Sequence, residues 1–185
     1  MKPKPTLTVL MIAIVLSSCG KKSIIDKTAV SGVENAEISL NGTWKFNMDP
    51  PDRFWEAGIS TADWADIEVP GECAMQGFAI KHDQPYAYKH DFVIPEDFRG
   101  NQIFLNFYGV YSSARVWLNG QFVRDHDGGF TKWECDITDY VQAGEKAQLT
   151  VEIIDRIDDI SFGSGYAKHQ IGGILRDVEL VALPE

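Results

Sequence analysis

The sequence is poor in cysteine and in positive charge. It has three cysteines in 185 residues, and none belongs to a Cys-x-x-Cys pair of the kind that binds zinc or forms a thioredoxin-like redox centre. Seventeen lysines and arginines stand against 27 aspartates and glutamates, which gives a formal net charge of −10. Because nucleic-acid phosphates would be repelled by an acidic protein without a basic cluster, we expect no nucleic-acid partner.

The common catalytic and cofactor signatures are also missing. The sequence has no His-Glu-x-x-His, no phosphate-binding loop and no Gly-x-Ser-x-Gly, and its four histidines are scattered at no metal-ligand spacing. Asp155, Asp158 and Asp159 have the oxygen ligands that a hard cation prefers, but we interpret this cluster as a solvated loop. A (β/α)₈ barrel needs about 250 residues, so that architecture is excluded. We expect one domain with no metal and no cofactor.

The N-terminus has the features of an export signal. After a basic start, residues 7–16 are mostly apolar and too few to span a bilayer. The Leu-Ser-Ser-Cys-Gly segment that follows resembles the bacterial lipobox, which predicts cleavage before Cys19 and lipidation of its thiol. We therefore expect a signal peptide over 1–18 and a lipidated flexible spacer over 19–36. The protein would be exported and held at the bacterial membrane, in the periplasm or on the cell surface, by its lipid alone.

The other two cysteines leave two interpretations open. In an exported chain, Cys73 and Cys135 could form a disulfide. They could equally be buried free thiols that pack as small apolar side chains.

From about residue 37 the sequence reads as a series of short strands. Trp44 and Phe46 alternate with polar residues, which is typical of a half-buried strand. Asn119-Gly120 is a strong signal for a type I′ hairpin turn. Only Pro51–Gly58 is expected to form a helical turn. The pattern predicts an all-β sandwich of two sheets, with strands at 43–48, 66–69, 86–94, 102–108, 114–118, 121–124, 131–137, 148–154 and 177–183.

Seven sequence segments, taken in order, closely resemble the N-terminal sugar-binding domain of glycoside hydrolase family 2. That family includes β-galactosidases, β-mannosidases and β-glucuronidases. The resemblance covers about 39–184. The segments are Leu40–Phe46, Val69–Glu72 with Met75–Phe78, Tyr86–Tyr88 leading into Phe92–Pro95, Phe107–Val110, Val116–Gly120, His126–Thr131 with Asp136–Thr138, and Gly172–Val178.

The resemblance implies a jelly-roll sandwich of the galactose-binding type over 37–185. In the family this domain precedes an immunoglobulin-like domain and a barrel, which supplies the two glutamates of retaining hydrolysis. The Asn-Glu dipeptide that carries the family's acid/base is absent here. We therefore assign no catalytic residue and expect the chain alone to be inactive.

The resemblance also suggests where a sugar would be contacted. Family β-galactosidases use an Asn and an Asp that this sequence lacks at the matching positions, so lactose-type recognition and its cation do not carry over. The candidates that remain for ligand contact are Tyr86, Tyr88, Lys168, His169 and Gln170. Packing of these residues against another domain is the open alternative.

Three functions are consistent with the sequence. The chain is expected to be the truncated N-terminal portion of a family 2 hydrolase, with immunoglobulin-like and barrel domains as partners and carbohydrate as ligand. The alternatives are a stand-alone glycan-binding surface lipoprotein and a module that docks onto a separately encoded hydrolase.

Overall fold

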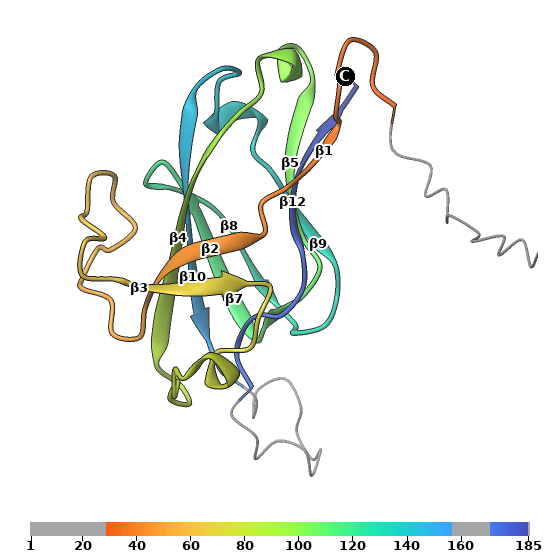
Figure 1. Cartoon of the computed structure of the whole chain (residues 1–185). Coiled ribbons are helices and arrows are strands. Elements are labelled where there is room, and N and C mark those ends of the chain that lie inside the picture. Colours follow the sequence, from red (N-terminus) through yellow and green to blue (C-terminus); the bar gives the residue numbers. More distant parts are fainter. Residues whose placement is uncertain (1–28, 157–170, 185) are drawn as a thin grey trace, which may run out of the picture.

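The computed structural model describes residues 29–156 and 171–184, which form two antiparallel sheets packed face to face (Figure 1). The four-stranded sheet has the order β1 (Glu37–Ser39), β12 (Val178–Leu183), β5 (Gln102–Phe107), β9 (Trp133–Asp136). The six-stranded sheet has the order β3 (Ala65–Val69), β2 (Gly42–Asn47), β4 (Pro85–Val93), β10 (Lys146–Ile154), β7 (Ser113–Leu118), β8 (Gln121–Asp127). A short ladder pairs β6 (Val110–Tyr111) with β11 (Gly173–Ile174). The prediction of an all-β sandwich is confirmed.

The helices of the described residues are three single 3₁₀ turns. They are η1 (Ala74–Gln76), η2 (Glu96–Phe98) and η3 (Thr138–Tyr140). The helical turn predicted for Pro51–Gly58 is wrong, because this segment forms successive tight turns instead. Arg53 has a φ of 59°, and this left-handed residue prevents the run of right-handed residues that a helix needs. Within the described residues, no helix is long and apolar enough to cross a membrane.

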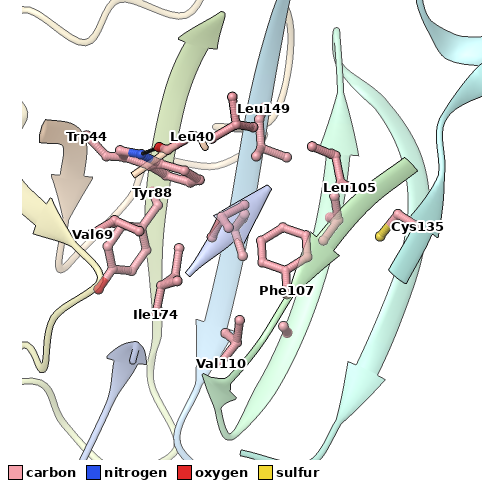
Figure 2. Close-up of a cluster of buried hydrophobic side chains, with 14 of the residues drawn as sticks. Leu40, Trp44, Val69, Tyr88, Leu105, Phe107, Val110, Cys135, Leu149 and Ile174 are labelled. Atoms are coloured by element: carbon pink, nitrogen blue, oxygen red, sulfur yellow. Dashed lines mark hydrogen bonds between the residues drawn. The ribbon is translucent and has the colours of Figure 1, made fainter. Parts of the chain in front are cut away.

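The main core lies between the two sheets, where alternate residues of each strand point inward (Figure 2). Leu105 and Phe107 of β5 meet Leu149 of β10 across the sandwich, and all three are buried. Trp44 is buried as well, and its indole Nε1 donates a hydrogen bond to the carbonyl of Leu40 at 2.8 Å. The predicted alternation in β2 therefore places Trp44 and its neighbour Phe46 in the core.

Both described cysteines are buried free thiols. Cys135 lies on β9, and Cys73 lies just before η1 with its Sγ 3.1 Å from the Tyr88 hydroxyl. Of the two interpretations left open by the sequence, the structure supports the free thiols. Burial raises the pKa of both thiols to about 12.

The hairpin between β7 and β8 turns at Asn119 and Gly120, which have φ of 51° and 83°. Two positive φ values are what a type I′ turn requires, so the predicted turn is confirmed. The Asn119 side chain adds two hydrogen bonds that tie the turn to neighbouring elements: its Nδ2 donates to the carbonyl of Tyr140 in η3 at 3.2 Å, and its Oδ1 accepts from the amide of Gln148 in β10 at 2.9 Å.

Candidate functional site

One end of the sandwich gathers several of the family-like segments of the sequence. Strand β4 begins there beside the end of β10, and η1 and the β6–β11 ladder lie next to them. The amide of Gly71 donates to the carbonyl of Ile174 at 2.8 Å, and the amide of Cys73 donates to the carbonyl of Gly172 at 2.9 Å. Residues 71–73 and 172–174 therefore run side by side across the base of this end, although a hundred residues separate them.

Tyr86 and Tyr88, predicted as ligand contacts, lie inside this end on β4. They are 1% and 0% exposed. The Tyr86 hydroxyl donates to the carbonyl of Tyr111 at 3.2 Å, and the Tyr88 hydroxyl lies against the thiol of Cys73. Burial raises the pKa of both phenols well above the usual value. Their hydroxyls thus bind groups of the protein, and Tyr86 also lines the pocket described below.

The other predicted contacts, Lys168, His169 and Gln170, lie outside the described residues, as does the lipidation site Cys19. Asp158 and Asp159 of the acidic cluster lie there too. Asp155 is buried, and its Oδ2 is 3.7 Å from Nδ1 of His82. The described residues contain no group of three or more metal-ligating side chains.

At Gly172 and Gly173 the backbone packs closely against Tyr86 and Tyr88. A Cβ at position 172 would lie 2.6 Å from the Tyr86 hydroxyl, and one at 173 would lie 2.9 Å from the Tyr88 hydroxyl. Gly173 also has a φ of 121°. The glycine pair of the family-like Gly172–Val178 segment is thus required by close packing and by backbone conformation.

An open pocket of 210 Å³ lies at this end, between the segment after β2 and the segment before β4. Lys81, Gln84 and Asp49 offer donors and acceptors, while Met48 and Ile80 offer apolar surface. Ala79 and Tyr86 complete the lining. A mixture of apolar surface and a few polar groups is typical of a site for a small polar ligand such as a sugar. Apart from Tyr86, sequence reasoning did not single out these residues, because no motif marks them.

The sequence analysis also missed a second aromatic cluster, on the outer face of the six-stranded sheet. Phe54, Trp55 and Trp64, from the segment between β2 and β3, pack over Trp117 of β7. The Lys89 ammonium lies 5.7 Å from the centre of the Trp64 ring. Burial lowers the pKa of this lysine, which is 2% exposed. The segment between β2 and β3 therefore covers part of a face that strand alternation predicts to be solvated.

Comparison with known proteins supports the resemblance. The family profile described as glycosyl hydrolases family 2, sugar binding domain, matches residues 38–184. A β-galactosidase of Halalkalibacterium halodurans is 32% identical over 179 residues, which cover 79% of this chain and 17% of the relative. A β-galactosidase large subunit of Leuconostoc lactis is 25% identical, over 79% of this chain and 29% of the relative.

Solved structures agree with this relationship. A β-glucuronidase of Ruminococcus gnavus, in complex with an N1-substituted uronic isofagomine, superposes with a TM-score of 0.69 at 25% identity, over 80% of this chain and 30% of that one. The β-glucuronidase 2 of Bacteroides uniformis superposes with a TM-score of 0.71 at 25% identity, over 80% of this chain and 18% of that one. The chain thus spans less than a third of the length of these relatives, which are larger hydrolases. From residue 38 to residue 184, the chain belongs to glycosyl hydrolases family 2 as a sugar binding domain.

Proposed function

We propose that the chain serves as the N-terminal sugar-binding module of a hydrolase that cleaves β-galactosides or β-glucuronides. The supporting observation is the pocket at the end of the sandwich, which lies among family-like segments and has polar groups suited to sugar hydroxyls. The catalytic carboxylates of retaining hydrolysis would come from a barrel domain, which this chain is too short to contain. The printed activities of the relatives suggest the two substrate classes.

In this proposal, the chain binds and orients a sugar and makes no covalent bond to it. The Gln84 amide and the Asp49 carboxylate offer acceptors for sugar hydroxyls, and the Lys81 ammonium offers donors. The ammonium would also pair with the carboxylate of a glucuronide. Met48, which is about half exposed, offers apolar surface to a face of the sugar ring.

Titration of the isotope-labelled full chain with methyl β-galactoside and methyl β-glucuronide tests this site. We expect saturable amide shifts around the pocket, which Gln84→Ala and Lys81→Ala weaken at least fivefold. Lys146→Ala is the matched control, because Lys146 is exposed and starts β10 at the opposite end of the sandwich. Saturable binding that all three variants retain would place the sugar elsewhere, and absence of binding would contradict the proposed role of the pocket.

A second form of the same proposal is that the chain docks onto a separately encoded barrel protein. Two relatives, of Leuconostoc lactis and Latilactobacillus sakei, are named β-galactosidase large subunits, so an enzyme with this domain can be divided between chains, and in both the domain is part of a longer subunit. Affinity purification of the tagged chain from its own host would recover a barrel protein in stoichiometric amount. A continuous reading frame into a barrel domain would support the one-chain form instead.

We further propose that the chain is a lipoprotein held in the membrane through Cys19. The lipobox-like segment after a short apolar run supports this proposal. Cells that express the chain would incorporate labelled palmitate into it, and Cys19→Ser would abolish labelling and release the chain from the membrane fraction. An unlabelled wild-type chain would refute the proposal.

A further inference from the structure

A groove lies on the outer face of the six-stranded sheet, apart from the end pocket. Its volume is 370 Å³, and a smaller hollow of 60 Å³ adjoins it, since Glu152 lines both. Strand pairing explains the contact between them: Pro85 of the larger hollow pairs with Ile154 of the smaller one, and Ile154 pairs with Ser113. We call the two together the outer groove.

One wall of the outer groove is apolar and held in place. Pro50, Pro51, Phe54 and Trp55 of the segment between β2 and β3 form it. The Trp55 ring stacks on Trp117 with 5.3 Å between centroids and 12° between planes, and Phe54 contacts Trp55 edge-on at 5.2 Å. Because the ring is already fixed, a ligand that packs against it loses little free energy in ordering the wall.

The other side of the outer groove carries charged side chains from β7, β8 and β10. Arg115, Glu152 and Asp125 lie in one cross-strand row, and Nη1 of Arg115 is 3.5 Å from Oε1 of Glu152. Asp127 accepts a hydrogen bond from the Ser113 hydroxyl in the next row. Glu152 is 7% exposed, and burial raises the pKa of its carboxyl. This side thus offers one desolvated carboxylate, that of Glu152, beside the exposed carboxylates of Asp125 and Asp127.

The charge balance of the outer groove indicates what it would accept. Four carboxylates line it, with three arginines. Two of those arginines are already paired, Arg53 with Glu56 and Arg115 with Glu152. A ligand with its own carboxylate would therefore be repelled, whereas hydroxyl groups could donate to the carboxylates.

We propose that the outer groove is a second carbohydrate site, which binds a neutral pyranose with one ring face against Trp55 and its hydroxyls on Glu152 and Asp127. A sugar ring has both surfaces that this arrangement needs: an apolar face of C–H groups and a rim of hydroxyls. This inference rests on the proposed sugar-binding function, but it concerns a different face of the molecule and excludes the uronic acids that the end pocket could accept.

The test uses the full chain with lactose and cellotetraose as neutral probes and tetragalacturonate as the charged probe. Calorimetry and the tryptophan indole signals would report binding at the outer groove. We expect Trp55→Ala to weaken binding of the neutral probes by about tenfold or more, as truncation of a buried aromatic anchor does. Phe122→Ala is the matched control, because Phe122 also packs against Trp117, at 5.9 Å, but is 50% exposed and does not line the outer groove.

A second variant protects the test against loss of the fold. Glu152→Gln keeps the shape of the side chain and is expected to weaken binding of the neutral probes at least fivefold. An unchanged melting temperature would show that the variant is still folded. Neutral binding that survives both substitutions, or tighter binding of tetragalacturonate, would overturn the proposal. If binding is lost only in Gln84→Ala and Lys81→Ala, the end pocket stands and the outer groove fails; if no probe binds, both proposals fail.

Discussion

Replacement of Gly173 by alanine tests how closely the β6–β11 ladder packs on the tyrosines of β4. The new methyl carbon would lie 2.9 Å from the Gly71 carbonyl oxygen, 2.9 Å from the Tyr88 hydroxyl and 3.1 Å from the Cys73 sulfur. Carbon atoms do not approach backbone oxygen this closely, so the backbone of β11 or of residue 71 must move. Gly42→Ala is the matched control: Gly42 has a φ of 130°, close to the 121° of Gly173, but no atom lies within 4 Å of the added carbon.

The two substitutions share one cost and differ in another. A side chain at this φ costs about 1–3 kcal/mol of backbone strain at either position. Overpacking at position 173 adds about 1–3 kcal/mol. For a domain of this size, about 2 kcal/mol corresponds to a melting temperature roughly 4–8 °C lower. We therefore expect Gly173→Ala to melt at least several degrees below Gly42→Ala.

Calorimetric melting of the wild type and both variants, at the same pH and concentration, measures this difference. Near-ultraviolet circular dichroism would show in addition whether the environment of the tyrosines changes in Gly173→Ala alone. Equal melting temperatures for the two variants would refute the reasoning, because they would show that the close approach at position 173 has no energetic consequence.

Three further predictions concern stability and reactivity. At pH 8 a thiol with a pKa of about 12 has roughly a thousandth of the thiolate fraction of an ordinary thiol. Cys73 and Cys135 should therefore react with iodoacetamide about a thousand times more slowly, or slower still, in the native chain than in denaturant. Comparable rates would contradict their burial. Burial lowers the pKa of His90, which stacks on Trp44 at 4.7 Å, so the unfolded chain takes up the proton first and the free energy of unfolding should fall as the pH drops below 6.5. His90→Gln should reduce that loss in urea unfolding between pH 5 and 8, and an unchanged pH profile would contradict the assignment. Asn119→Gly keeps the turn conformation but removes both side-chain hydrogen bonds, so urea unfolding should show a loss of about 1–3 kcal/mol, and no loss would mean that the bonds contribute nothing.

The sequence predicted the strands well wherever one face of a strand is buried and the other is solvated. Trp44 and Phe46 in β2 follow this rule, and the Asn119-Gly120 turn depends only on local backbone preference. The β6–β11 ladder was missed because two-residue strands have no periodicity. Nothing in the chain near Gly173 indicates a partner more than sixty residues away.

The candidate site was harder to predict, because both faces of β4 are covered. Tyr86, Ala87, Tyr88 and Lys89 are all buried in succession, the first and third by the sandwich core and the others by the segment between β2 and β3. Alternation cannot separate a core tyrosine from a ligand-binding one in such a strand. The covering segment holds its aromatic residues in irregular turns, so no periodic pattern indicates where they pack.

The pairing of β1 with β12 has a mechanical consequence. Glu37 lies opposite Val181 and Ser39 opposite Glu179, so the entrance to β1 and the exit from β12 are at the same end of one short ladder (Figure 1). A force applied between residues 36 and 184 would open that ladder like a zipper, breaking its hydrogen bonds one after another instead of shearing them together. The sandwich therefore lies to one side of the line that joins residue 36 to residue 184. It adds little to the end-to-end length of a chain that is pulled at these two points.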